Sequence, residues 1–146
     1  MRFCYVPAGA RQKSCSVQAP LLFYRYAMSP SRFLYRIADL HDWQSAQQTG
    51  FFASADLAAE GFIHCSEKAQ VLETARRYYA GRHDVVLLEI DEAQLAAAGV
   101  RVEREWVEAR AEAFAHVFGP IPVAAVTRPL PFQPDAGGVF ALPAES

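Results

Sequence analysis

Hydrophobic residues recur along the chain in short runs that predict β-strands. Phe33–Ala38 is rich in aromatic and branched residues, which favour strands. Val85–Ile90 is almost continuously apolar, as is typical of a central strand covered on both faces. Val100–Val107 alternates between apolar and polar positions, and Phe62–Cys65 is a shorter apolar run. We therefore expect these four segments to form strands.

Other stretches have the apolar period of a helix. Asp39 is placed to cap a helix that Gly50 ends. A second helix is expected between Ser66, as its cap, and Gly81. The apolar stripe of this second helix consists of Val71, Leu72, Ala75, Tyr78 and Tyr79. A third, shorter helix is expected after Asp91.

The remaining regions have weaker patterns. Residues 51–60 are expected to be a connector with one helical turn at 57–59, and 111–118 is ambiguous between a helix and a loop. Ile121–Thr127 is a further strand candidate, and the proline-containing tail is expected to run extended to a short strand at Val139–Leu142. These elements predict an α+β domain with a mixed or split β-sheet and two or three helices.

The composition is that of a folded globular protein. Hydrophobic residues make up 52% and charged residues 21% of the 146 residues, which suits one hydrophobic core and is short for two domains. A formal net charge of -2 argues against nucleic-acid binding, and no apolar run is long enough to cross a membrane. Three cysteines without a CxxC pair favour a reducing, cytoplasmic compartment.

The start of the chain differs from the rest because it has no clear strand or helix period. Its apolar stretch Leu21–Tyr26 is too short for a signal peptide and is interrupted by Arg25. We therefore expect residues 1–28 to be a poorly ordered N-terminal extension and residues 29–146 to be a single α+β domain.

The segment Gly61–Ser66 (GFIHCS) carries the most informative polar side chains. Strand alternation places His64 and Ser66 on one side and Cys65 on the other. The strand-to-helix corner presents backbone N–H groups that suit an anion, and histidine exchanges protons near neutral pH. The alternative is that Ser66 only caps the helix and His64 is a hydrogen-bonded core residue. Cys65 is expected to be a small buried hydrophobe.

A second candidate, His116, lies among apolar neighbours, so its ring needs a polar partner or a cavity. The alternative is a satisfied, half-buried histidine. A metal site on His64 and His116 would need a third ligand such as Cys65 or Glu103. Because the alternation turns Cys65 away from His64, we expect no metal.

No sequence motif fixes a reaction. The chain has no Walker loop, no GxGxxG, no GxSxG and no HExxH. The acidic pairs in 89–91 and 103–105 are expected to belong to solvated faces of strands.

Three segments, taken in order, carry a family resemblance. They are Tyr35–Ile37 (YRI), Gly61–Ser66 (GFIHCS) followed by Gln70, and Phe114–Pro120 (FAHVFGP). With them the chain resembles the bacterial domain-of-unknown-function family 952 (DUF952) over about residues 33 to 143. It departs from that family at Ala115, commonly a proline, and at Phe118, commonly a tyrosine, whose hydroxyl this chain therefore lacks.

The family is in turn remotely similar to ADP-ribosyltransferase-like domains. That similarity implies a split sheet whose central cleft holds NAD or a related nucleotide. By position, the cleft residues are Arg36 on the first strand, His64 with Ser66 on a second, and His116 on a later one. The usual catalytic glutamate has no counterpart in this chain. Fold similarity alone does not establish an activity.

The resemblance also implies a role for each candidate. His64 and His116 are the catalytic candidates: His64 orients a ribose hydroxyl, and His116 orients or polarises the reacting group. Arg36 holds phosphate through a charge-assisted fork. The ligand-binding candidates are Arg36, Ser66, Tyr35 and Gln70.

The leading hypothesis is therefore a nucleotide-binding, ADP-ribosyltransferase-like domain that takes NAD, with transferase activity left open. The first alternative is a non-catalytic domain that binds a small ligand or serves regulation. The second is a metal-dependent hydrolase built on His64 and His116. The expected partner is a small molecule, and neither a nucleic acid nor a membrane is expected.

Overall fold

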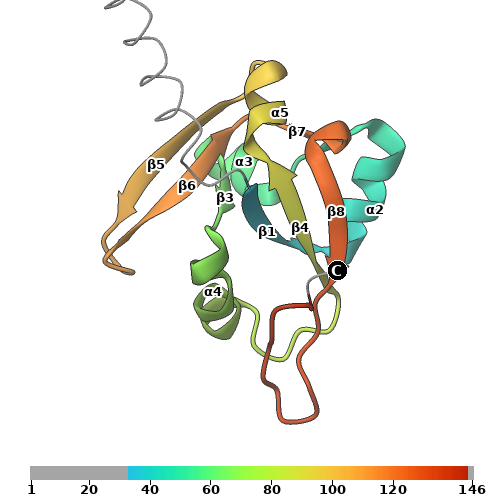
Figure 1. Cartoon of the computed structure of the whole chain (residues 1–146), viewed down its shortest axis with the longest axis vertical. Helices are drawn as coiled ribbons and strands as arrows, with labels where there is room; N and C mark the ends of the chain where they lie inside the picture. The colour runs from blue at the N-terminus through green and yellow to red at the C-terminus, as the bar shows by residue number, and fades with distance from the viewer. Residues whose placement is uncertain (1–32, 145–146) are drawn as a thin grey trace, which may run out of the picture. The chain divides into compact units, whose positions relative to one another are not determined.

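The computed structural model describes residues 33–144, and Figure 1 shows the arrangement of their helices and strands. The predicted extension, residues 1–28, lies outside the described residues. Residues 33–144 form an α+β domain with four α-helices, more than the two or three expected. Within this range no helix combines the length and the apolar character needed to cross a membrane.

The central sheet contains β1 (Phe33–Asp39), β4 (Val85–Asp91) and β8 (Val126–Pro131), with β4 in the middle. All seven residues of β4 are buried, which confirms the prediction of a central strand covered on both faces. The tail was expected only to run extended, but Pro129 and Pro131 belong to β8. Proline is tolerated there because β8 is an edge strand and has a neighbour on one side only.

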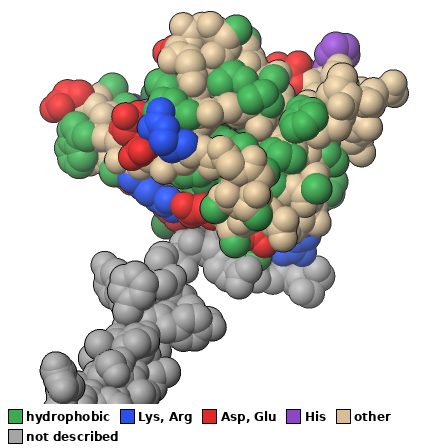
Figure 2. All heavy atoms as spheres, turned by 90° about the horizontal axis from the view of Figure 1, so that it is seen from above, with side chains coloured by type: hydrophobic (Ala, Val, Ile, Leu, Met, Phe, Trp, Pro, Cys, Tyr) green, Lys and Arg blue, Asp and Glu red, His purple; other side chains and the backbone are tan. Residues whose placement is uncertain are grey.

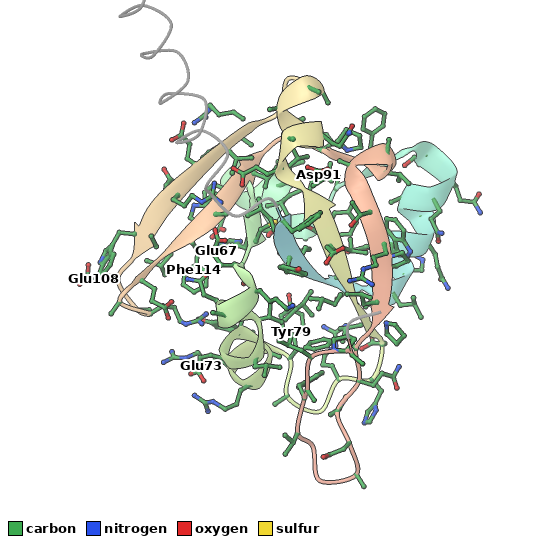
Figure 3. The ribbon with its side chains drawn as sticks, viewed as in Figure 1. Glu67, Glu73, Tyr79, Asp91, Glu108 and Phe114 are labelled. Carbon is green, nitrogen blue, oxygen red and sulfur yellow. The ribbon has the colours of Figure 1, made fainter. Side chains whose placement is uncertain are left out.

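A second sheet contains β3 (Ile63–Cys65), β6 (Glu112–Phe118) and β5 (Arg101–Val107), with β6 in the middle. The expectation of a helix or a loop at 111–118 was wrong, because this segment is the strand β6. Its small and branched residues alternate with larger ones and pair with β5 across a hairpin whose tip carries Glu108 (Figure 3). All strand pairs among the described residues are antiparallel, so the expected mixed sheet is not found.

A third, two-stranded sheet pairs β2 (Phe51–Phe52) with β7 (Ile121–Pro122). The predicted strand Ile121–Thr127 is thus divided into β7, a 3-10 turn at Val123–Ala125 and the start of β8. The helical turn expected at 57–59 belongs to α3 (Ala55–Glu60). The strand expected at Val139–Leu142 is absent from the described structure.

The other helices are α2 (Leu40–Thr49), α4 (Val71–Tyr78) and α5 (Glu92–Ala97). The predicted end of α2 is confirmed at Gly50, whose positive φ of 92° suits glycine. The cap of α5 is confirmed too, since the Asp91 carboxylate accepts a hydrogen bond from the Ala93 N–H at 2.9 Å.

Ser66 was expected to cap the helix that follows it, and this was wrong. A 3-10 turn at Lys68–Gln70 precedes α4, and Glu67 and Gln70 cap that turn reciprocally. Ser66 instead pairs through its backbone with Tyr35 on β1, with N–H···O distances of 2.8 and 2.9 Å. This bridge connects the second sheet to the central sheet.

Two apolar clusters cover the two faces of the central sheet. The first lies between the two three-stranded sheets and includes Leu34 and Leu88 from one, and Ile63 and Val117 from the other. The second lies under α4 and the C-terminal tail, and its members include Tyr35, Ile37, Val71, Ala75, Leu87, Phe132 and Phe140. Because side chains alternate along β1, Tyr35 and Arg36 point to opposite faces of the sheet.

The helix α4 packs through fewer residues than its stripe predicts. Val71 and Ala75 are fully buried, whereas Leu72 is 38% exposed and Tyr78 is 58% exposed. Figure 3 shows Glu73 on the outer side of this helix. The packing of α4 therefore rests on Val71 and Ala75.

This difference predicts unequal costs for two substitutions on one helix. Val71→Ala removes buried methyl groups and leaves a cavity, so it should lower the free energy of unfolding by about 2–3 kcal/mol. Leu72→Ala should cost less than about 1 kcal/mol because Leu72 already contacts solvent. Urea unfolding of both variants checks the prediction, and equal costs would contradict it.

Candidate functional site

His64 and His116 meet on the outer face of the second sheet. They are directly paired across β3 and β6, and their ring centroids are 5.1 Å apart. Alternation sends Ile63 and Cys65 inward to the core, so the histidines point the other way. We call the two histidines and the side chains that contact them the two-histidine site.

The Asp56 carboxylate, at the start of α3, holds His64 in place. Asp56 Oδ2 accepts hydrogen bonds from the His64 backbone N–H at 2.9 Å, from His64 Nδ1 at 2.9 Å and from Arg36 Nη1 at 3.0 Å. Asp56 Oδ1 accepts a further bond from the Ser54 hydroxyl. These donors come from β1, β3 and the residues beside α3, so one carboxylate ties three parts of the chain together.

Two opposing effects act on the pKa of Asp56. Burial raises it, while the hydrogen bonds from His64 and Ser54 and the positive charge of Arg36 lower it. The lowering effects win, and the pKa lies well below the usual range of an aspartate. Asp56 is therefore an anion that only accepts hydrogen bonds, and Nδ1 of His64 is the donor.

His64 is half-exposed, with 47% of its side chain in contact with solvent. Its second ring nitrogen, Nε2, lies 3.3 Å from Glu60 Oε1 at the end of α3. The ring therefore has a carboxylate on each side, the part-buried Asp56 and the exposed Glu60.

His116 has a similar arrangement but is buried. Its Nδ1 lies 2.6 Å from Glu105 Oε1 on the neighbouring strand β5, and only 6% of its side chain is exposed. The Phe62 ring stacks on the imidazole at 4.0 Å and 17°. Its Nε2 is buried and has no hydrogen-bond partner among the described residues. Such an unpaired buried polar atom is uncommon and needs an explanation.

Arg36 reaches the site, but its guanidinium is already engaged and is not free to bind a phosphate. Its Nη1 donates to both Asp56 Oδ2 and the His64 carbonyl oxygen, the latter at 2.9 Å, and its side chain is only 13% exposed. The role that this geometry gives Arg36 is to position Asp56 and the β3 backbone.

The other three candidates lie away from the histidine rings. Tyr35 donates from its hydroxyl to Glu89 Oε2 at 2.9 Å on the opposite face of the central sheet, and burial there raises its pKa to about 12. Gln70 donates to the Ala113 carbonyl at 2.9 Å and so connects the start of α4 to β6. Ser66 is buried beside Tyr35 in the backbone bridge.

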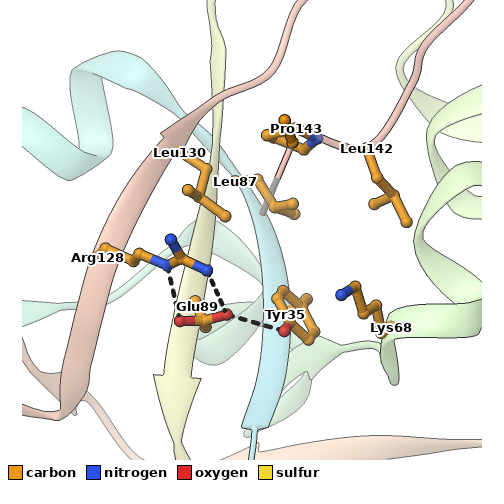
Figure 4. A pocket seen from close by; sticks show the side chains of 9 residues that line it. Tyr35, Lys68, Leu87, Glu89, Arg128, Leu130, Leu142 and Pro143 are labelled. Carbon is orange, nitrogen blue, oxygen red and sulfur yellow. Dashed lines mark hydrogen bonds and ion pairs between the residues drawn. The ribbon is translucent and has the colours of Figure 1, made fainter. Parts of the chain in front are cut away.

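Glu89 and Asp91 were expected on a solvated face, and this was wrong because both are buried. Glu89 accepts hydrogen bonds from Tyr35, Thr127 and Arg128 beside a pocket on this face (Figure 4). The pocket has a volume of about 20 Å³, room for about one water molecule. Its lining includes Lys68, Leu130 and Leu142 and neither histidine.

Cys65 is buried in the core as predicted, and burial raises its thiol pKa to about 12. Within residues 33–144, no group of three His, Cys, Asp or Glu side chains is arranged to hold a metal ion. The metal-hydrolase alternative therefore gains no support from the described geometry.

Sequence reasoning missed Asp56, Glu60, Glu105 and Phe62 as parts of the site. The sequence did hold a signal for Phe62, because strand alternation places it on the same face as His64. Glu105 was hidden because β6 was not recognised as the partner of β5. Asp56 had no signal, since its helix was expected to be a connector.

The comparisons with known proteins identify a family. Residues 37–129 match the family described as protein of unknown function (DUF952). A crystal structure of protein CC0527 from Caulobacter crescentus is 32% identical, with a TM-score of 0.67, over 75% of this chain and 94% of that one. The solution NMR structure of CC0527 is 34% identical, with a TM-score of 0.61, over 73% and 90%. A search of curated proteins gave no match.

The lowered pKa of Asp56 gives a pH-dependent prediction. A carboxylate whose pKa is lower in the folded than in the unfolded state adds stability above about pH 5 and loses it as the pH falls below about 4. Asp56→Asn should therefore be less stable than the wild type at pH 7, and the gap should narrow toward about pH 2. Urea unfolding across this range measures the gap, and a constant gap would contradict the assignment.

Proposed function

The chain belongs to the DUF952 family, and we propose that its two-histidine site binds a phosphorylated nucleotide, with NAD or ADP-ribose as the first choice. The observation that carries the proposal is the meeting of Arg36, His64 and His116, which come from three strands. Arg36 donates to the His64 carbonyl, and His64 is paired with His116 across β3 and β6. The buried, unpaired Nε2 of His116 adds to it, because such an atom is costly unless something hydrogen-bonds to it.

The charges around the histidines favour the sugar end of such a ligand. Asp56, Glu60 and Glu105 contact the two rings, and Arg36 is already paired with Asp56. Carboxylates repel phosphate but stabilise the positive charge that develops on a ribose when its glycosidic bond weakens. We therefore assign the ribose and nicotinamide of NAD to the histidines.

The phosphates fit better at the other end of the same sheet face. Arg101 lies over the Phe118 ring at 3.9 Å, and 59% of its side chain is exposed. Phe118 in turn neighbours Phe62 at 5.4 Å between ring centroids, so aromatic rings connect the arginine to His116. Arg101 also contacts Glu103 at 3.1 Å, an exposed ion pair that an anionic ligand can displace at low cost.

The ADP-ribosyltransferase-like fold that the sequence resemblance implies would take the same ligand and would favour transferase chemistry. Glu105, on β5, is the carboxylate that contacts His116. A binding domain without chemistry is the second candidate. It is favoured by the absence of a tyrosine hydroxyl at Phe118 and by the engagement of Arg36 with Asp56. Release of nicotinamide from NAD by the purified chain distinguishes the two.

Nucleotide binding can be tested by thermal unfolding. NAD or ADP-ribose at one hundred times its dissociation constant should raise the stability by about 2.7 kcal/mol. His64→Ala should remove most of this gain, and the variant should still fold because the ring is half-exposed. His83→Ala is the matched control, since His83 is an exposed histidine outside the site.

Two results would argue against the proposal. One is the absence of any thermal shift with NAD, ADP-ribose or other nucleotides at millimolar concentration. The other is an equal loss of the shift in His64→Ala and His83→Ala.

A further inference from the structure

Both histidines are held by a carboxylate on the same ring nitrogen. His64 Nδ1 lies 2.9 Å from Asp56 Oδ2, and His116 Nδ1 lies 2.6 Å from Glu105 Oε1. A carboxylate can only accept hydrogen bonds, so each Nδ1 must carry the proton. In a neutral imidazole the other nitrogen, Nε2, is then a lone-pair acceptor.

The two carboxylates are suited to fix this state to different degrees. Asp56 is part-buried, and Arg36, Ser54 and the His64 backbone hold it, so it cannot turn away from the ring. Glu105 is 47% exposed and accepts a hydrogen bond from His116 Nδ1 at the edge of the sheet. The carboxylate that fixes His64 is therefore part-buried, and the carboxylate that fixes His116 is exposed to solvent.

The Nε2 of His116 is turned toward His64. Glu105 is on β5, and β6 lies between β5 and β3. Because Nδ1 of His116 faces β5, Nε2 on the far side of its ring faces β3, where His64 is directly paired with it. The Nε2 of His64 differs, because the carboxylate oxygen Glu60 Oε1 already lies 3.3 Å from it. The acceptor left for a ligand is therefore the buried His116 Nε2.

We propose that Asp56 and Glu105 are positioning residues that hold the Nδ1 proton of each histidine, so that the buried His116 Nε2 is an acceptor for the donor groups of the ligand. This inference rests on the proposed function and specifies it. Hydroxyls of a ribose and the NH₂ of a carboxamide are uncharged donors, whereas the oxygens of an ionised phosphate are acceptors only. The donor enters beside the half-exposed His64 and hydrogen-bonds to His116 Nε2.

The positioning roles can be tested on the full chain without any ligand. Long-range ¹H–¹⁵N correlation spectra of the imidazoles at about pH 8 should show both rings with a proton on Nδ1 and the His116 ring with a bare Nε2. A proton on Nε2 of His116 in the wild type would overturn the inference. This spectrum is measured on the wild type, so the test does not depend on whether a variant folds.

Two variants make the test specific. Glu105→Ala should move the His116 proton to Nε2, the form that a free histidine prefers, and leave the His64 spectrum unchanged. Asp56→Ala should move the His64 proton from Nδ1 to Nε2 and leave the His116 spectrum unchanged. Each histidine is thus the control for the other, and an unchanged tautomer in Glu105→Ala would contradict the positioning role of Glu105.

The ligand class is tested by titration of the wild type with ADP-ribose, nicotinamide and inorganic pyrophosphate. ADP-ribose or nicotinamide should shift the His116 Nε2 signal, and a shift with only one of them tells the ribose hydroxyls from the carboxamide. Pyrophosphate, which has neither group, should leave this signal in place. Glu105→Ala should weaken binding about tenfold. ADP-ribose that binds without moving the His116 Nε2 signal would overturn the inference but not the proposed function, whereas no binding at all would overturn the function.

Discussion

The Asp56 carboxylate accepts hydrogen bonds from Arg36 on β1, from Ser54 beside it, and from both the backbone and the ring of His64 on β3. The His64 half of the two-histidine site depends on this group. It sets the proton of His64, connects α3 to β3, and gives the part-buried Arg36 guanidinium a negative partner. Loss of the carboxylate would leave that part-buried charge without its ion pair, which costs more than the pair itself contributes.

This arrangement explains why a polar site can be built on so small a domain. The inner faces of β3 and β6 pack on the central sheet through residues such as Ile63 and Val117, so the outer faces are held rigidly. The backbone bridge between Tyr35 and Ser66 joins the sheets next to His64. Acidic and basic side chains lie side by side on the face shown in Figure 2, without a broad basic surface there.

The parts of the fold that could be predicted are those where the sequence pattern of a single segment shows which of its side chains are buried. The continuous apolar run of β4 and the alternation through His64 and Cys65 each describe a local burial pattern, and both are confirmed. The strand β6 was missed because its alternation of alanine, phenylalanine and histidine also suits a helix, and only its pairing with β5 decides the matter.

The candidate site was predicted only in part for a related reason. His64 and His116 were found because a histidine in an apolar stretch is conspicuous in sequence. Asp56 and Glu105 were not, since an aspartate before an alanine-rich turn and a glutamate in a charged strand resemble ordinary surface residues. Their roles arise from contacts between elements far apart in the chain. The same contacts changed the interpretation of Arg36 from a phosphate ligand to a partner of Asp56.

The most direct test of the central claim is a double-mutant cycle between Asp56 and His64. Asp56→Ala, His64→Ala and the double variant are compared with the wild type by urea unfolding at pH 7. If Asp56 fixes His64 as described, the effects should be non-additive, with a coupling of about 1–3 kcal/mol. Additivity within about 0.5 kcal/mol would show that the two side chains do not act together, and it would contradict this account of the site.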